Sequence, residues 1–312
     1  MTTRFFRAYY VWPRFPSLSM SGNQCNLHCK HCNHTYLNDM ISVTTPDQLY
    51  TAAQELQNKN AVGFLLSGGC TPMGEMINLR HLLPTIAKIK QRTNLIIKLH
   101  TGIVDQVLAE SIVSAGVDIA SLEIVGSTEN IQQIFGFSAT QESYAQTLQH
   151  LETAGMPHIV PHICIGLNHG KLSSEQQALE IIQTHCTPSV IVMIVFRPTR
   201  GTPLYQVSPP SPHEIATVIQ YAKNKFPGIE ISLGCIRPRT YLRREIELAA
   251  FQAGVTRMEI PSKTTLTHIQ QMGYTIRCID ACCALPKEYE NPSFYHEGSN
   301  AQSYPQQITN TR

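Results

Sequence analysis

Short apolar segments alternate with amphipathic segments over most of the chain. Each apolar run has the length of a strand buried on both faces, and each following segment carries apolar residues three and four positions apart, as one face of a helix does. Ser, Gly, Pro and Asp residues separate the two kinds of segment. The pattern predicts strands at residues 15–23, 61–66, 95–99, 119–125, 159–167, 190–196, 229–233 and 255–260, each followed by a helix, at 48–58, 79–90, 105–115, 142–154, 174–185, 212–226, 242–253 and 264–272.

These successive strand–helix units predict an α/β fold, a complete or nearly complete (βα)8 barrel of the TIM type. The loops after the strands form the working face of such a barrel, so side chains near strand ends are the candidates for function. We assign the barrel to residues 1–273 and a cysteine-bearing C-terminal extension to 274–297. A flexible tail is expected at 298–312, where Ser, Asn, Gln and Thr are frequent.

The composition is that of a soluble globular protein. The 312 residues are 42% hydrophobic, with a mean hydropathy of −0.12, which is enough apolar material for a core. The net charge is only +2, so we expect neither nucleic acid nor a membrane surface as a partner. No apolar run reaches the ~18 residues of a membrane-spanning helix, and residues 1–14 lack the pattern of a secretory signal, so we expect a cytoplasmic protein. Ten cysteines in that reducing compartment indicate metal binding or redox chemistry.

Three cysteines lie in one short loop after the first predicted strand. Cys25, Cys29 and Cys32 have the spacing C-x3-C-x2-C, which lets three thiolates bind one [4Fe–4S] cluster and leaves one iron without a protein ligand. The open iron is free to bind the amino and carboxylate groups of S-adenosylmethionine. A ferredoxin-like carrier would need a fourth nearby cysteine, and the next one is Cys70. Zinc is the alternative, because histidines at positions 28, 31 and 34 interleave with the cysteines.

The loop and its position resemble those of the radical S-adenosylmethionine (radical SAM) superfamily. In that family an aromatic-type residue near the adenine usually precedes the third cysteine, and His31 holds this position here. From the residues alone, a glycine pair after a strand is equally typical of a tight turn, and Glu123 is equally typical of a surface ion pair. The resemblance implies further cofactor contacts by Ser67, Gly68 and Gly69 to the methionyl amine, by Glu123 to a ribose hydroxyl, and by Ile165, within residues 163–167, along the adenine.

The remaining cysteines indicate a second metal site. Cys278, Cys282 and Cys283 lie close together after the last predicted helix, while Cys70 and Cys235 follow the second and seventh predicted strands. We predict a second [4Fe–4S] cluster with ligands drawn from these five, formed as the extension folds over the barrel mouth and Cys70 or Cys235 completes the set. A redox-active pair or unreactive thiols are the alternatives.

Two clusters in one small radical SAM enzyme are typical of sulfur insertion, where one cluster generates the radical and the other gives sulfide to the substrate carbon. Residues 201–204 (GTPL) and 232–237 (SLGCIR) resemble biotin synthase and place Arg237 where that family has an arginine on its auxiliary cluster. Over most of residues 17–283 the chain is most similar to the archaeal-type two-protein lipoyl synthases. The similarity is carried by the cysteine loop and by residues 67–70 (SGGC), 100–105 (HTGIVD), 160–167 (VPHICIGL), 198–202 (PTRGT) and 233–238 (LGCIRP).

This resemblance implies thiolation of C6 or C8 of a protein-bound octanoyl chain, and hence a role in lipoate biosynthesis. The partners it implies are an octanoylated carrier protein or lipoyl domain, a paralogous lipoyl synthase subunit, and ferredoxin or flavodoxin as electron donor. His100, His162 and Arg237 are the candidate substrate contacts, although packed barrel histidines are the commoner explanation for the first two. Another radical SAM enzyme of the biotin synthase-like group and a non-catalytic iron–sulfur protein are the alternatives.

Overall fold

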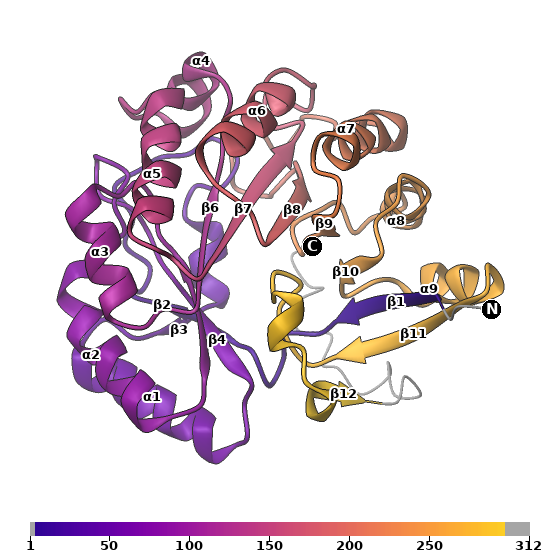
Figure 1. Cartoon of the computed structure of the whole chain (residues 1–312). Helices are drawn as coiled ribbons and strands as arrows, with labels where there is room; N and C mark the ends of the chain where they lie inside the picture. Colours follow the sequence, from indigo (N-terminus) through magenta and orange to yellow (C-terminus); the bar gives the residue numbers. More distant parts are fainter. Residues whose placement is uncertain (1–3, 297–312) are drawn as a thin grey trace.

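The strands form one curled sheet with helices on its outer side (Figure 1). The structure is a computed structural model that describes residues 4–296. Within them the sheet has twelve strands, in the order β12-β11-β1-β10-β9-β8-β7-β6-β5-β4-β2-β3. The strands are β1 (Arg4–Tyr9), β2 (Ser17–Ser19), β3 (Ile41–Ser42), β4 (Gly63–Ser67), β5 (Ile96–His100), β6 (Ile119–Glu123), β7 (His158–Ile165), β8 (Val190–Val195), β9 (Glu230–Leu233), β10 (Arg257–Glu259), β11 (Tyr274–Ile279) and β12 (Tyr295–His296).

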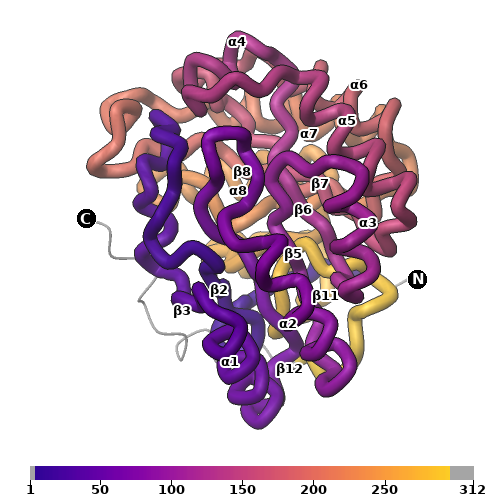
Figure 2. Tube along the Cα trace, turned by 90° about the vertical axis from the view of Figure 1, so that its left-hand side faces the viewer, coloured from indigo at the N-terminus to yellow at the C-terminus, as the bar shows by residue number. Residues whose placement is uncertain are grey.

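The helices cover the outside of the sheet, as Figure 2 shows from the side. Several begin at strong caps: Thr45 and Gln48 form a capping box around Pro46, the first helical residue of its helix, and Ser211 and Glu214 form another. No helix in the described part of the chain is both long and apolar enough to cross a membrane. The helices are α1 (Pro46–Asn58), α2 (Leu79–Arg92), α3 (Gln106–Ser114), α4 (Thr128–Asn130), α5 (Gln141–Thr153), α6 (Glu175–His185), α7 (Pro212–Lys225), α8 (Arg243–Gln252) and α9 (Lys263–Gln271), with single turns at η1 (Thr35–Asp39), η2 (Ile131–Phe135), η3 (Lys287–Tyr289) and η4 (Pro292–Phe294).

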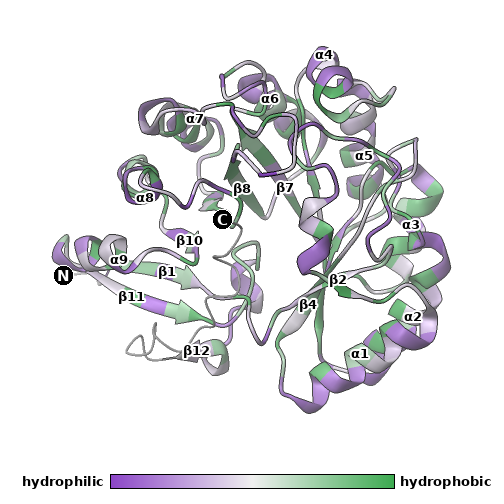
Figure 3. Ribbon diagram, turned by 180° about the vertical axis from the view of Figure 1, so that it is seen from behind, coloured by the Kyte–Doolittle hydropathy of each residue, from purple (hydrophilic) through white to green (hydrophobic). Residues whose placement is uncertain are grey.

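The predicted TIM-type barrel is confirmed. β2 and then β4 to β10 neighbour one another in chain order, with helices between them, and all strands from β11 to β3 run parallel. Parallel strands covered on both sides form continuous apolar runs, and the strands are the most hydrophobic part of the fold (Figure 3). In the described residues the edge strands β3 and β12 do not pair with each other, so the barrel stays open along one side.

One strand is not predicted by the hydrophobic pattern. β1 inserts between β10 and β11, although its sequence contains two arginines and lacks the apolar run of the other strands. The reason is that the Arg7 guanidinium is neutralised by carboxylates distant in sequence, those of Glu230 and Glu290. A charged side chain is thus accommodated inside the sheet's curl only through tertiary pairing.

The C-terminal extension begins as part of the same sheet, because β11 pairs with β1 over its whole length. After β11 the chain lies across the inner side of the curl (Figure 1), where Arg257 donates to the Leu285 carbonyl and Arg7 to Glu290, 2.9 Å away. The assignment of residues 274–297 as a separate unit stays a prediction. The tail at 298–312 lies outside the described residues.

Candidate active site

The Cys25–Cys32 loop follows β2 and rests against the turn after β4. The Asn26 amide donates to the Cys70 carbonyl, 2.8 Å away, and the Cys70 amide donates to the Cys25 sulfur, 3.3 Å away. Within the loop, the amides of Cys32 and Asn33 both donate to the Cys29 carbonyl. These bonds hold the loop at the ends of adjacent parallel strands, where the working face of a barrel lies.

Gly69 is required for this contact. A Cβ at Gly69 would lie 2.0 Å from the Gln24 carbonyl oxygen and 2.5 Å from the Cys25 Cβ, so only glycine lets the two backbones approach. The Gly69 amide donates to the Ser21 hydroxyl, 2.7 Å away, and a Cβ at Gly68 would lie 3.0 Å from the same hydroxyl. The structure thus gives the glycine pair a packing role beside the cysteine loop, and its backbone contact with a cofactor stays a prediction.

The thiols of this loop lie near one another and near Cys70. Burial raises the pKa of Cys29, and Cys32, Cys25 and Cys70 raise it further. Burial, with Cys25 and Cys32, likewise raises the pKa of Cys70 to about 12. Several thiols that oppose one another's ionisation form a favourable site for a cationic cluster, because a bound metal reverses that cost.

Two buried atoms beside the cysteine loop have no partner in the described residues, His31 Nδ1 and Glu123 Oε1. The His31 ring packs edge-on against Phe135, with centroids 5.1 Å apart, and burial lowers its pKa to about 4. Burial raises the pKa of Glu123 to about 7. Unpartnered buried polar atoms are costly unless a ligand satisfies them. Together with the cysteine sulfurs, they fit a [4Fe–4S] cluster carrying S-adenosylmethionine.

A small cavity adjoins Glu123 between β6, β7 and α6, and its lining includes Ile163, Leu167 and Ser174. Ile165, the predicted adenine contact, is fully buried in the hydrophobic core. The cavity thus brings Glu123 together with the segment 163–167, while the individual contacts to adenine and ribose stay predictions.

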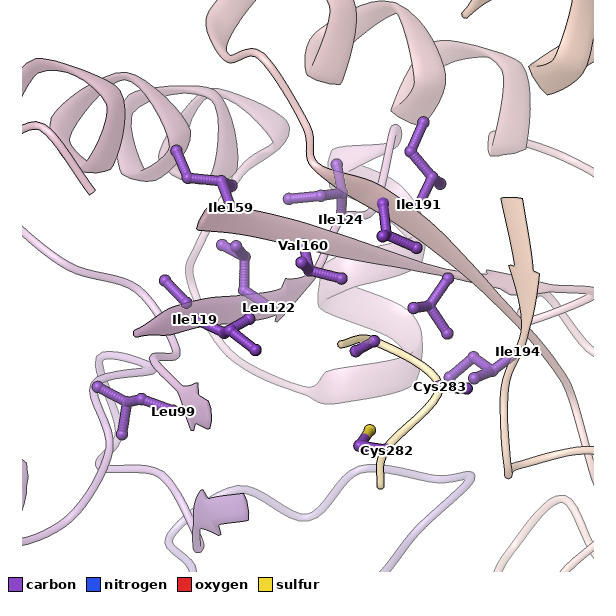
Figure 4. Close-up of a cluster of buried hydrophobic side chains, with 14 of the residues drawn as sticks. Leu99, Ile119, Leu122, Ile124, Ile159, Val160, Ile191, Ile194, Cys282 and Cys283 are labelled. Atoms are coloured by element: carbon purple, nitrogen blue, oxygen red, sulfur yellow. The ribbon is translucent and has the colours of Figure 1, made fainter. Parts of the chain in front are cut away.

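A second group of thiols lies inside the curl. Cys282 and Cys283 are buried on the segment after β11, beside apolar side chains of β5 to β8 such as Ile194 (Figure 4). Their sulfurs and a carboxylate oxygen of Glu259, on β10, lie within 4.8 Å of one another. The Cys283 amide donates to that carboxylate, 3.0 Å away. These residues form a potential metal site among the described residues.

Lys98 is the cation of this second group. Its ammonium is buried and donates to the Cys282 sulfur, 3.6 Å away, and it lies 3.5 Å from His162 Nε2. Burial opposes the charge, but Cys282, Cys283, Cys235 and Glu259 outweigh it and raise the pKa of Lys98. The hydrogen bond from Cys283, helped by Lys98, lowers the pKa of the Cys282 thiol.

The other predicted ligands divide between different places. Cys235 follows β9 and is exposed; desolvation raises the pKa of its thiol to about 11, with Glu259 and Cys282 adding to the effect. Because β9 pairs with β10, Cys235 lies on the strand next to Glu259, outside the close group of Glu259, Cys282 and Cys283. Cys70 lies with the Cys25–Cys32 loop instead. Cys278 packs with Ala8 and Tyr10 in a separate apolar cluster, so the structure does not bring it to Cys282 and Cys283.

The predicted substrate contacts lie beside the second group. The His100 and His162 rings meet edge-on, with centroids 5.4 Å apart, and burial together with Lys98 lowers both pKa values, that of His100 to about 3. Arg237 is fully buried: it pairs with Glu247 at 2.6 Å and donates to the carbonyls of Gly234 and Glu259, among others. Only its Nε has no partner in the described part of the chain. Arg237 thus has a structural role, and its contact with substrate or a cluster stays a prediction.

Sequence reasoning missed Lys98 and Glu259. Lys98 stands two residues before His100 in the strand IIKLH, so alternation puts the two on one face. A lysine within an otherwise apolar buried strand was therefore a usable signal. Glu259 stands in the same relation to Arg257 in β10, but nothing local indicates which far segment it meets.

Comparisons with known proteins identify a superfamily and a fold. The family model "Radical SAM superfamily" matches residues 20–183. No curated protein matches the sequence. The maturase HydG from Carboxydothermus hydrogenoformans has a similar structure, with TM-score 0.64 and 12% identity over 93% of this chain and 71% of HydG. Methylornithine synthase (PylB) gives TM-score 0.59 and 15% identity over 88% of this chain and 83% of PylB.

Another HydG structure gives TM-score 0.62 and 11% identity over 88% of this chain, which spans 64% of that protein's length. At such low identities these likenesses show the fold alone. The sequence evidence is stronger, because the family model covers more than half of the chain and includes the cysteine loop at the end of β2. The chain belongs to the radical SAM superfamily.

Proposed function

We propose that this radical SAM enzyme inserts sulfur in the manner of a lipoyl synthase, thiolating C6 or C8 of a protein-bound octanoyl chain, with an auxiliary [4Fe–4S] cluster as sulfur donor. The observation that carries the proposal is the second thiol group inside the curl, where Cys282 and Cys283 lie beside Lys98 and Glu259. Sulfur insertion is a radical SAM chemistry that uses a second cluster, and this thiol group offers a place for one. The resemblance to two-protein lipoyl synthases supplies the substrate class.

The chain's own residues divide the work between the two sites. Radical SAM membership implies a [4Fe–4S] cluster with S-adenosylmethionine, which supplies a hydrogen-abstracting radical when bound. In the proposal Cys25, Cys29 and Cys32 hold this cluster, while His31 and Glu123 offer their unpartnered atoms to the S-adenosylmethionine. The neighbouring neutral imidazoles of His100 and His162 line the way to the second site and orient the substrate.

The proposal includes partners and a compartment. The substrate is carried by an octanoylated carrier protein or lipoyl domain, a paralogous lipoyl synthase subunit attacks the other carbon, and ferredoxin or flavodoxin supplies electrons in the cytoplasm. These assignments are supported by the sequence resemblance and by the chemistry of the clusters, which need a reducing compartment.

The test is to count iron and sulfide in anaerobically reconstituted protein, beside a variant with Cys25, Cys29 and Cys32 all changed to Ala. We expect about eight iron per chain for the wild type and about four for the variant, because each [4Fe–4S] site binds independently. Cys186→Ala is the matched control, since this buried cysteine belongs to neither group and its loss should leave the iron count unchanged.

A positive count is followed by mass spectrometry of an octanoylated carrier domain after incubation with S-adenosylmethionine and a reductant, where the mass of inserted sulfur is expected. A count of about four iron in the wild type and none in the variant would remove the sulfur donor and leave another radical SAM reaction. Zinc in place of iron at both sites would overturn the proposal altogether.

A further inference from the structure

The second thiol group contains a carboxylate in a ligand position. The Glu259 carboxylate and the sulfurs of Cys282 and Cys283 meet within 4.8 Å, although they come from β10 and from the segment after β11. Glu259 is only 2% exposed. A carboxyl group at such depth is neutral, or is paired, hydrogen-bonded or bound to a metal. The two thiol sulfurs within 4.8 Å of it favour a metal, because thiolates and carboxylates together form metal sites in proteins.

The described residues supply Glu259 with little compensation. The carboxylate accepts hydrogen bonds from the Cys283 amide, 3.0 Å away, and from the Cys283 thiol, and within residues 4–296 no basic side chain lies within ion-pair distance of Glu259. Arg237 donates to the backbone carbonyl of Glu259, but its ion pair is with Glu247. Lys98, the nearby ammonium, donates to the Cys282 sulfur instead.

The thiols that share this place with Glu259 can be separated from those that do not. Cys235 follows β9, which pairs with β10 beside Glu259, with Leu233 opposite Met258. Cys70 hydrogen-bonds to the Cys25 sulfur, and Cys278 packs with Ala8 and Tyr10. Two cysteines and Glu259 therefore converge here, and Cys235, which follows the neighbouring strand β9, is the remaining candidate for the four ligands of a [4Fe–4S] cluster.

We propose that Glu259 is the fourth ligand of the auxiliary cluster, which Cys235, Cys282 and Cys283 hold through their sulfurs, with the Lys98 ammonium balancing the charge of the ligand set. The inference rests on the proposed function in that it assumes an iron–sulfur cluster at this place. A hard carboxylate binds iron less strongly than a soft thiolate does. The iron bound by Glu259 is then the most labile iron of the cluster and the first to be lost.

The test uses the full chain with Cys25, Cys29 and Cys32 changed to Ala, so that only the auxiliary site is observed. Glu259→Cys and Glu259→Gln are reconstituted in this background, and iron, sulfide and zinc are counted beside the electron paramagnetic resonance spectrum of the reduced protein. Glu259→Cys should keep about four iron, with a changed spectrum and a lower reduction potential, because an anionic thiolate replaces a weaker ligand. Glu259→Gln should lose most of its iron.

Two control variants fix the interpretation. Cys278→Ala removes a buried cysteine on the same extension and should leave iron and spectrum unchanged. Cys235→Ala removes a proposed ligand and should lower the iron count as Glu259→Gln does. If Glu259→Gln fails to fold, Glu259→Cys decides alone, since a thiolate ligand at this position must alter the spectrum if residue 259 binds iron.

The failures are distinguishable. A parent protein that binds no iron, or binds zinc without sulfide, contradicts the auxiliary cluster and with it the proposed function. A parent with about four iron whose count and spectrum are the same in both Glu259 variants overturns the ligand role of Glu259 and leaves sulfur insertion standing. Loss of iron in Cys278→Ala would show that the ligand set is different from the one proposed.

Discussion

The two sulfur-rich regions of this barrel are built in opposite ways. The first comes from one stretch, Cys25 to Cys32, whose short spacing alone brings three thiols together. The second joins Glu259, on β10, with Cys282 and Cys283, on the segment after β11, and exists only once the sheet has curled. The contrast shows that one group of thiols can be carried by a local motif, whereas the other depends on the whole fold.

The two regions also differ in how they stabilise the negative charge of a thiolate. Near the Cys25–Cys32 loop, burial and neighbouring thiols raise the pKa of Cys29, so ionisation there depends on an incoming metal. In the second region, the Lys98 ammonium lies 3.6 Å from the Cys282 sulfur and favours its thiolate in advance. A site with its own cation is prepared to hold anionic ligands even after metal has departed.

The largest effect is expected from Gly69→Ala, which should impair the first region and leave the second unaffected. The new Cβ would lie 2.0 Å from the Gln24 carbonyl oxygen, so the cysteine loop must shift. We expect cleavage of S-adenosylmethionine to fall by roughly 100-fold or more, as small displacements in reacting sites do, while the iron of the second region is retained. Chromatographic assay of 5′-deoxyadenosine and an iron count measure the two quantities.

Gly155→Ala is the control for this comparison. Gly155 has a positive φ of 76°, but a Cβ at this position would meet no atom of the described residues within 4 Å. The change therefore costs about 1 kcal/mol of folding free energy, from the backbone conformation alone. It should leave both the cleavage of S-adenosylmethionine and the iron content unchanged. Unchanged cleavage in Gly69→Ala would mean that the loop tolerates the shift, and the proposed dependence of the first region on this backbone contact would be wrong.

What the sequence could predict follows the same division. The spacing of Cys25, Cys29 and Cys32 predicts that their thiols lie together, because the geometry of that loop is local, and the structure has them near one another. The alternation of strands and helices likewise predicts the barrel. Cys70 was a candidate for the second cluster, since a sequence tells which strand a residue follows but not the neighbour it meets; in the structure it lies against Cys25. The partnership of Lys98 with Cys282 spans most of the chain and has no local signature.

β1 is a second example of long-range pairing that the sequence does not reveal. Its arginines obscure the strand pattern in the sequence, because the pairing of Arg7 with Glu230 and Glu290 becomes visible only in three dimensions. A charged residue within an apolar strand can be noticed in the sequence. The residue with which it pairs cannot. The residues that sequence reasoning overlooked are therefore those whose meaning depends on a distant ion pair or hydrogen bond.

A second prediction concerns the frame of the second region, the buried pair of Arg237 and Glu247. Burial opposes the charge of Glu247, but Arg237 overrides it and lowers the pKa to about 2, below the ~4.3 of an unfolded glutamate. A depressed carboxyl pKa contributes stability above the unfolded value, and that stability is lost as pH falls from about 4.3 towards 2. Glu247→Gln should therefore unfold with roughly 3 kcal/mol less free energy at pH 6, and about half of that difference should remain at pH 3.

Urea unfolding of the metal-free protein at both pH values measures this difference. Glu142→Gln, an exposed position in the first turn of α5, is the matched control and should change little at either pH. Because Arg237 also binds the carbonyls of Gly234 and Glu259, Glu247→Gln should weaken iron binding in the second region and spare the first. Equal loss of iron from both regions would contradict their independence.

The smallest effect, and the one that tests the role of charge most directly, is expected from Lys98→Met. Without metal, Cys282, Cys283, Cys235 and Glu259 already favour the charge of Lys98, so Lys98→Met should destabilise the protein by about 1 kcal/mol, or lower its melting temperature by about 2 °C. With the second region loaded, the same change removes the cation that faces an additional anionic ligand set and should lower the melting temperature further. Differential scanning fluorimetry of both states, beside Lys98→Arg as the charge-retaining control, measures the two shifts. Equal shifts in both states would mean that the charge of Lys98 does not act on a bound cluster, because a loaded ligand set gives that charge a further stabilising partner.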